Sequence, residues 1–309
     1  MTPQRLTIAD KPKTWVGAMR LRTLPLALAC IMLGAFLAGA DDKLDGVVVV
    51  LCVVTAVLLQ ILSNLANDYG DSLHGADHSE RLGPARAVQS GAITPQAMKR
   101  AMGIFAGLSV VSGLALVVVA FGLEALPLVL LFLVLGAASL WAAVNYTAGK
   151  NPYGYAGLGD LFVLLFFGWV GTIGTYFLQT QTFSWALLLP ASSAGLLAVA
   201  VLNVNNIRDI ESDKQAGKRS IPVRLGPERA RIYHWCLLMM AFVLAGIYAW
   251  FTYQTLWQFL FVLAAPLLVQ HGTAVQRTHD PLRLNPLLKQ MVFTAVIFDF
   301  LLGLGQVIG

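Results

Sequence analysis

The chain has 309 residues, of which 57% are hydrophobic and only 12% are charged, with a formal net charge of +5. Soluble domains carry about 25% charged residues, so the composition excludes an ordinary soluble protein and predicts an all-α polytopic membrane protein. Long apolar runs, in place of short alternating segments, exclude a transmembrane β-barrel. The positive charge does not indicate nucleic-acid binding, because the basic residues are concentrated in particular loops.

Long apolar runs recur along the whole chain, and a spanning helix needs about 20 mostly apolar residues. The sequence therefore predicts nine transmembrane helices, at roughly 20–40, 46–66, 98–120, 125–146, 157–179, 184–204, 231–251, 256–274 and 288–307. The first run ends in small residues, as signal peptides do, but we interpret it as a membrane helix because a second span follows closely. We expect residues 1–309 to form a single domain with a central cavity.

Basic residues predict the orientation of these spans. With a cytoplasmic N-terminus, all of the 21 lysines and arginines except Lys43 fall on the cytoplasmic side. This asymmetry is typical of the positive-inside rule. We therefore expect a multi-pass protein of a bacterial cytoplasmic (inner) membrane, embedded in the lipid bilayer, with its C-terminus outside.

The end of the second span is unusually acidic. Asn64, Asn67 and Asp71 are spaced i, i+3 and i+7, which places them on one helix face. Asp77 follows six residues after Asp71, whereas Asp68 points off this face. The site is predicted to lie at the cytoplasmic side of the membrane.

A similar stretch ends the sixth span. Asn205, Asp209 and Asp213 are spaced by four residues and form one stripe, with Glu211 off it. Both stretches fall on the same membrane face, so we expect them to face each other across a cavity and to hold Mg²⁺, which prefers such oxygen ligands. The alternative is that these acids are solvated charges that cap helix ends.

Basic residues accompany both acidic stretches. Arg86 follows the first, Lys218 and Arg219 follow the second, and Tyr146 and Lys150 end the fourth span. Such cations either form salt bridges or bind a phosphorylated group whose charge the metal does not fully neutralise. Together with a membrane cavity, they predict a lipid diphosphate substrate.

The two stretches resemble the Asp-rich motifs of the UbiA superfamily of intramembrane aromatic prenyltransferases, in Asn67-x3-Asp71 with Asp77 and in Asn205-x3-Asp209-x3-Asp213. Tyr146-x3-Lys150 resembles the Tyr-x3-Lys element of that family. The interval from Asp71 to Asp77 is six residues instead of the family's four, which leaves the role of Asp77 open.

Within the superfamily, the segments Tyr155–Asp160 and Gly217–Gly226 resemble the menaquinone-pathway branch. The resemblance implies transfer of a polyprenyl group from polyprenyl diphosphate to 1,4-dihydroxy-2-naphthoate, with loss of diphosphate and CO2, giving demethylmenaquinone. Expected metal ligands are Asn67, Asp71, Asp77, Asn205, Asp209 and Asp213. Expected substrate-binding residues are Asn64, Arg22, Arg86, Lys150, Lys218 and Arg219, and expected catalytic residues are Asp71, Asp209, Tyr146 and Lys150.

Several assignments have alternatives. Tyr146 either stabilises a carbocation through its ring face or is an interfacial tyrosine, and Arg22 either meets the acceptor carboxylate or anchors the span. Asp160 is a further candidate for the pocket, whereas Asp299 has no assigned role. A sister prenyltransferase acting on 4-hydroxybenzoate or haem is the alternative enzyme. An ion-coupled transporter is the alternative of another class, although transporters usually place their acids near the membrane midplane.

Overall fold

The computed structural model describes residues 11–73 and 86–309. Within these ranges nine helical segments are long and apolar enough to cross a membrane, which confirms the predicted number. Their bounds are Pro12–Ala40, Gly46–Leu73, Pro95–Phe121, Leu126–Asn145, Gly159–Thr180, Trp185–Arg208, Pro227–Phe251, Leu256–Arg277 and Pro281–Ile308. The second span runs to Leu73, beyond the predicted end at 66, because its polar residues continue the helix.

Several spans are assembled from shorter helical pieces. The first contains α1 (Lys11–Met19), the 3-10 helix η2 (Leu21–Thr23) and α2 (Leu24–Ala40). The others, in chain order, are α3 (Gly46–Leu73), α4 (Pro95–Phe121), α5 (Leu126–Asn145), α6 (Gly159–Val163), η3 (Leu164–Ile173), α7 (Gly174–Thr180), η4 (Trp185–Leu187), α8 (Leu188–Arg208), α9 (Ile210–Gln215), α10 (Ile221–Leu225), α11 (Pro227–Phe251), η5 (Leu256–Ala264), α12 (Ala265–Arg277), η6 (Pro281–Arg283) and α13 (Leu284–Ile308).

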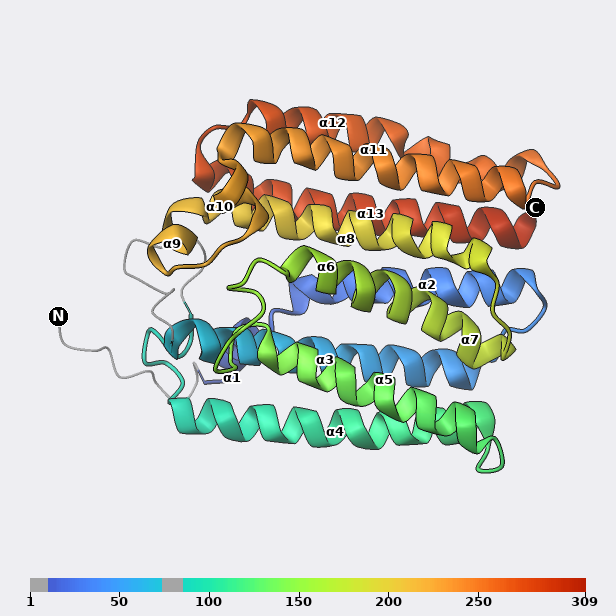
Figure 1. The fold of residues 1–309 in the computed structure, drawn as a ribbon, viewed down its shortest axis with the longest axis horizontal. Helices are drawn as coiled ribbons and strands as arrows, with labels where there is room; N and C mark the ends of the chain where they lie inside the picture. The colour runs from blue at the N-terminus through green and yellow to red at the C-terminus, as the bar shows by residue number, and fades with distance from the viewer. Residues whose placement is uncertain (1–10, 74–85) are drawn as a thin grey trace.

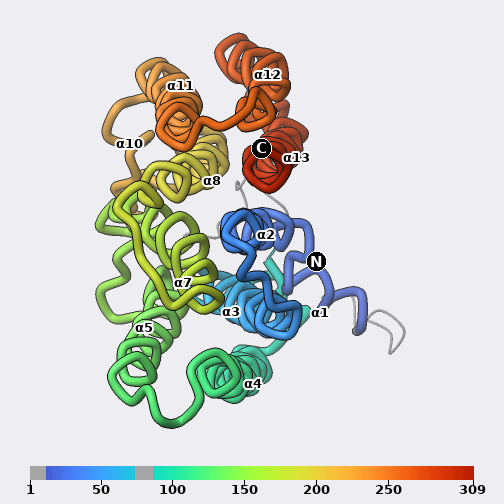
Figure 2. Tube along the Cα trace, turned by 90° about the vertical axis from the view of Figure 1, so that its right-hand side faces the viewer, coloured from blue at the N-terminus to red at the C-terminus, as the bar shows by residue number. Residues whose placement is uncertain are grey.

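The long helices lie side by side with their axes roughly aligned (Figure 1). Viewed along these axes, the chain passes from α2 through α3, α4, α5 and α7 to α8, and then to α11, α12 and α13 (Figure 2). The last helix, α13, packs against both α2 and α8, which brings the two ends of the helical series together. The short helices α9 and α10 lie beside the end of α8, at the end of the bundle where α3 also ends (Figure 1).

A large apolar core holds the C-terminal helices together. Leu33, Leu197, Leu238, Phe261 and Phe298 are fully buried in one cluster that joins α2, α8, α11, η5 and α13. A separate cluster around Leu116 and Phe121 joins α3, α4 and α7. α2 contributes buried residues to both clusters and therefore joins the two groups of helices.

The fifth span departs from α-helical geometry in its middle. The segment η3 (Leu164–Ile173) is a π-helix, flanked by the α-helical pieces α6 and α7. Such segments are rare and occur often at functional sites. In this protein Phe166 and Phe167 of η3 line the cavity described next.

Candidate active site

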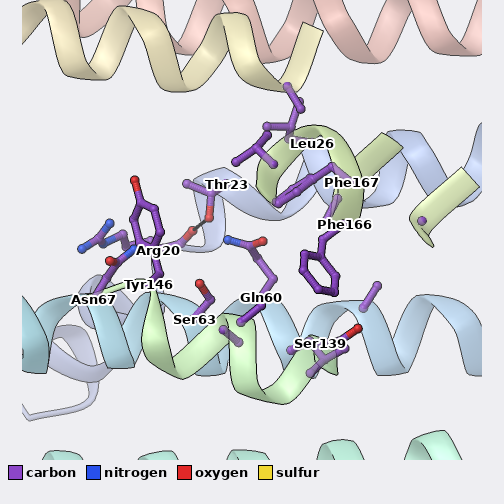
Figure 3. A pocket seen from close by; sticks show the side chains of 18 of the residues that line it. Arg20, Thr23, Leu26, Gln60, Ser63, Asn67, Ser139, Tyr146, Phe166 and Phe167 are labelled. Atoms are coloured by element: carbon purple, nitrogen blue, oxygen red, sulfur yellow. Dashed lines mark hydrogen bonds between the residues drawn. The ribbon is translucent and has the colours of Figure 1, made fainter. Parts of the chain in front are cut away.

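A cavity of about 1500 Å³ lies among the helices and combines two kinds of lining. One end carries the residues predicted from the motifs, namely Asn67, Asp71, Arg86, Asn205, Asp209, Asp213 and Lys218. The remainder is largely apolar, with Leu116, Phe132, Phe166 and Leu178 among its residues. Figure 3 shows Arg20, Asn67 and Tyr146 together at one side, with Phe166 and Phe167 further along. The two acidic stretches therefore face one common space, as predicted.

In the first stretch, Asp71 is held by a neighbouring arginine, Arg86. Asp71 is buried near the end of α3, and its Oδ2 accepts a hydrogen bond from Arg86 Nη2 at 2.7 Å. Asp68, which the sequence placed off the main stripe, accepts hydrogen bonds from the backbone N–H groups of Ala87 and Val88, both at 3.0 Å. Asp68 thereby fixes the turn that carries Arg86. Asp68 also lines the cavity beside Arg86.

In the second stretch, the helical hydrogen bonds continue across a helix boundary. α8 ends at Arg208 and α9 begins at Ile210, yet Asp209 N donates to Asn205 O (3.2 Å) and Asp213 N donates to Asp209 O (2.8 Å). The three predicted ligands therefore remain on one stripe.

Arg208, absent from the predicted site, orients this stripe. Its guanidinium donates to both carboxylate oxygens of Asp209 (2.7 and 2.6 Å) and to Asn205 Oδ1 (2.8 Å). Arg208 is buried and also donates to Asn285 Oδ1 on α13 at 2.9 Å. The sequence offered one signal for Arg208, which is its position inside the motif between Asn205 and Asp209. Its contact with Asn285 on α13 was not predictable from residue spacing.

Lys218 provides the buried cation beside the second stretch. Its Nζ lies 3.3 Å from Asp213 Oδ1. Burial alone lowers the pKa of Lys218, but Asp213 and Asp71 outweigh this effect and raise it above its ordinary value. Burial raises the pKa of Asp213 to about 6, with Lys218 opposing the shift and Asp209 adding to it. The ammonium of Lys218 is therefore kept charged at the cavity wall.

Tyr146 is brought to the cavity by close docking of the end of α5 onto α3. Thr147 Oγ1 donates to Asn67 Oδ1 (3.0 Å) and Ala66 O (3.2 Å). A side chain at Gly70 would collide with the Thr147 backbone, so only glycine allows this approach. Burial raises the pKa of Tyr146 to about 12, with Lys218 opposing the shift. Tyr146 is therefore neutral at physiological pH.

The joint between α1 and α2 adds two arginines to the cavity wall. Arg22 was predicted, whereas Arg20 was not, and both line the cavity. Arg20 has φ 47° and ψ 53°, a left-handed conformation that costs a non-glycine residue about 1–3 kcal/mol. Thr23 Oγ1 supports this turn by donating to Arg20 O at 2.9 Å. In the view of Figure 3, Arg20 lies on the same side of the cavity as Tyr146 and Asn67. Arg20 is half-buried.

Three predicted substrate-binding residues do not lie among the residues that line this cavity. α5 ends at Asn145, so a spacing of four no longer places Lys150 on the face of Tyr146, and Lys150 is exposed. Arg219 is also exposed. Asn64 is buried and donates to Met19 O (2.9 Å) and Thr23 Oγ1 (3.0 Å), so it fastens the α1–α2 joint to α3.

Three further acids are placed differently from the motif residues. Asp77 lies outside the described residues. Asp160 accepts a hydrogen bond from Tyr233 Oη at 2.9 Å and does not line the main cavity. Asp299 is buried within α13 and is not among the residues that line the cavity.

The donor set at the cavity end is compatible with a hard divalent cation. Carboxylate and amide oxygens are the ligands that Mg²⁺ prefers, and Mg²⁺ usually keeps several waters and a substrate phosphate. Asp213 Oδ2 is buried and has no hydrogen-bond partner within residues 11–73 and 86–309. Over the same ranges, no three His, Cys, Asp or Glu side chains form one cluster that could hold a metal ion. A divalent cation held here would therefore also need amide oxygens or a phosphate as ligands.

The fold and this cavity define a polytopic membrane protein with an acidic, cation-lined site at one end of a hydrophobic chamber. Residues 27–289 match the UbiA prenyltransferase family. The chain therefore belongs to this family, as the motifs predicted.

Named relatives extend over nearly the whole chain. A 1,4-dihydroxy-2-naphthoate octaprenyltransferase of Escherichia coli (strain K12) is 48% identical over 305 residues, which cover 99% of this chain and 97% of the relative. The enzyme of that name from Haemophilus influenzae is 44% identical, with 98% of each chain covered. A solved structure of a UbiA homolog from Archaeoglobus fulgidus bound to GPP and Mg²⁺ has a TM-score of 0.60 and 16% identity, covering 96% of this chain and 100% of the other. This last likeness concerns the fold.

Proposed function

We propose that this protein transfers a polyprenyl group from polyprenyl diphosphate to 1,4-dihydroxy-2-naphthoate. The observation that carries the proposal is the division of the cavity into a charged end and a long apolar part. A polyprenyl diphosphate has the same division, with an anionic head and a hydrocarbon tail. The high identity to relatives that are named for this reaction supports the choice of acceptor.

The charged end suits the binding of a diphosphate. Arg86 and Lys218 are cations at the cavity wall and bind its oxygens in this proposal. Asn67, Asp71, Asn205, Asp209 and Asp213 would hold magnesium, with Asp77 as a further candidate ligand. When bound, magnesium would neutralise negative charge on the leaving diphosphate.

The acceptor is assigned to the wall formed by Arg20 and Tyr146. A half-buried arginine can bind a carboxylate with two parallel hydrogen bonds, so Arg20 is proposed to hold the naphthoate carboxylate, with Arg22 nearby. The ring face of Tyr146 can stabilise positive charge that develops on the allylic carbon. The apolar lining excludes water, which would otherwise capture the carbocation.

The reaction balances without a redox partner. The C–O bond between the prenyl group and diphosphate breaks, and the electron pair leaves with diphosphate. An electron pair of the aromatic ring forms the new C–C bond. The carboxyl group at that ring carbon then leaves as CO2, and its bonding electrons restore the aromatic ring. The product is demethylmenaquinone in its quinol form.

We place the reaction at the cytoplasmic face of a bacterial inner membrane. This placement is supported by the basic residues, of which Arg86, Arg208 and Lys218 each pair with an acid of the two stretches. By the positive-inside rule the face that carries these cations is cytoplasmic.

The test uses the purified full chain in lipid nanodiscs with a labelled polyprenyl diphosphate. We expect a prenylated product, released diphosphate and CO2 with 1,4-dihydroxy-2-naphthoate, loss of turnover with EDTA and recovery with magnesium. Asp71→Ala or Asp209→Ala should abolish turnover in a folded protein. Product formation with 4-hydroxybenzoate alone would contradict the acceptor assignment, and full activity of either Asp variant would contradict the metal-site assignment.

A further inference from the structure

Tyr155 contacts a side chain of the first acidic stretch and the cation that pairs with the second. Its hydroxyl donates to Asp71 Oδ1 at 3.3 Å. On the other side, Lys218 Nζ lies 5.6 Å from the centre of the Tyr155 ring. Lys218 in turn pairs with Asp213. One side chain therefore touches a carboxylate on α3 and the cation that pairs with a carboxylate on α9.

The backbone around Tyr155 is fastened to the segment that follows the second acidic stretch. Arg219 N donates to Tyr155 O at 2.9 Å, and Arg224 Nη2 donates to Ala156 O at 2.7 Å. Gly157 has φ +82°, and a side chain there would collide with Arg219 O. The loop between α5 and α6 is thus held against this segment, which fixes the backbone position from which the Tyr155 side chain extends.

Two fixed donors orient the Asp71 carboxylate. Tyr155 bonds to Oδ1 and Arg86 bonds to Oδ2. Each carboxylate oxygen has a second lone pair, so both remain able to bind a cation. Groups behind a metal ligand commonly set its orientation, and their loss typically weakens metal affinity or activity about 10- to 100-fold.

Tyr155 does not lie among the described residues that line the cavity, so it acts through its neighbours. We propose that Tyr155 is a positioning residue that couples the two halves of the diphosphate site. Its hydroxyl orients Asp71 toward the metal, and its ring face holds Lys218 toward the diphosphate. This inference rests on the proposed function, because it takes Asp71 as a metal ligand and Lys218 as a diphosphate ligand.

Two substitutions separate these roles. Tyr155→Phe removes the hydroxyl and keeps the ring, whereas Tyr155→Leu removes both. Tyr233→Phe is the matched control, because Tyr233 Oη donates to Asp160 Oδ2 at 2.9 Å and neither residue lines the main cavity. The control thus removes the same kind of hydrogen bond from an acid that is not a proposed metal ligand.

The measurements are calorimetric titrations of the full chain in nanodiscs, with magnesium alone and with inorganic pyrophosphate at saturating magnesium. Tyr155→Phe should weaken magnesium affinity by about 10-fold or more. Tyr155→Leu should in addition weaken pyrophosphate affinity by about 2- to 5-fold, since the contact between Lys218 and the ring is lost. In the transfer assay, the KM for polyprenyl diphosphate should follow the same order. Tyr233→Phe should leave both affinities at the wild-type value.

Three outcomes would overturn the inference. One is wild-type magnesium affinity in Tyr155→Phe. Another is an equal loss in Tyr155→Phe and Tyr233→Phe, which would show a general structural effect. The third is equal pyrophosphate affinity in Tyr155→Phe and Tyr155→Leu. If Tyr155→Leu does not fold, the magnesium affinities of Tyr155→Phe and Tyr233→Phe are compared instead, and equal values overturn the inference. Wild-type protein that binds magnesium and pyrophosphate but prenylates no naphthoate would contradict the proposed function and leave the Tyr155 inference standing.

Discussion

Asp68 received no role from its spacing, and its replacement by Asn is a sharp test of the contacts it makes in the structure. Both carboxylate oxygens of Asp68 accept backbone hydrogen bonds, from Ala87 and Val88, each at 3.0 Å. Asparagine keeps one acceptor and turns the other into an N–H donor facing a backbone N–H. A hydrogen bond to a charged group contributes about 1.5–3 kcal/mol, so the variant should lose about 2 kcal/mol of support for this turn.

This loss should be visible in substrate binding, because the turn carries Arg86. If the full 2 kcal/mol is expressed at Arg86, kcat/KM for polyprenyl diphosphate should fall about 30-fold. Steady-state kinetics in nanodiscs, together with the thermal unfolding midpoint, would measure both effects. Glu211→Gln is the control, since Glu211 is exposed and does not line the cavity.

A double substitution makes the test more specific. If Asp68 acts only through Arg86, Asp68→Asn combined with Arg86→Gln should be no worse in kcat/KM than Arg86→Gln alone. Additive losses would show that Asp68 has another target. A kcat/KM of Asp68→Asn within about twofold of wild type would refute the magnitude derived above.

Three further predictions follow from the positions of charged groups. Lys218→Ala should raise the KM for polyprenyl diphosphate by at least about tenfold, because it removes a buried cation. Lys150→Ala should change this KM by less than about twofold, because Lys150 is exposed. Equal increases would contradict the assignment of Lys218 as the diphosphate ligand. Arg20→Gln should raise the KM for 1,4-dihydroxy-2-naphthoate more than Arg22→Gln does, since Arg20 is half-buried and Arg22 is exposed. The reverse order in steady-state kinetics would assign the naphthoate carboxylate to Arg22. Burial raises the pKa of Asp213 to about 6, and a metal binds only the ionised carboxylate. Magnesium affinity measured by calorimetry should therefore be constant above about pH 7. Below pH 6 it should fall by up to about tenfold per pH unit. A profile that is flat down to pH 5, or unchanged in Asp213→Asn, would exclude Asp213 as the group responsible.

Features of this protein that depend on neighbouring residues in the chain were predictable from the sequence. Nine apolar runs predicted the nine spans found in the described residues, because the length of a spanning helix is set by the bilayer and is readable from composition. The stripes Asn67–Asp71 and Asn205–Asp213 were predictable because helical spacing is a local property. That both stripes line one cavity also agreed with the prediction from topology.

Side chains that depend on tertiary contacts were not predictable in the same way. Lys150 has the spacing of a motif residue, but α5 ends before it and the chain turns, so its side chain is exposed. Lys218 and Arg86, which were also predicted, do lie beside the acids, but the loops that bring them there were not predictable from spacing. Arg20 reaches the cavity through a left-handed backbone conformation that no residue spacing indicates.

The sequence by itself thus determined the membrane class, the number of spans and the two acidic stripes, since these depend on hydrophobicity and on the helical repeat. The tertiary structure alone decided how the acids are divided. Asp71 and Asp209 are oriented at the cavity by arginines, whereas Asp68 holds a backbone turn. The physical reason is that a carboxylate's role depends on which donors surround it, and most of these donors come from residues distant along the chain or from loops whose path spacing does not specify.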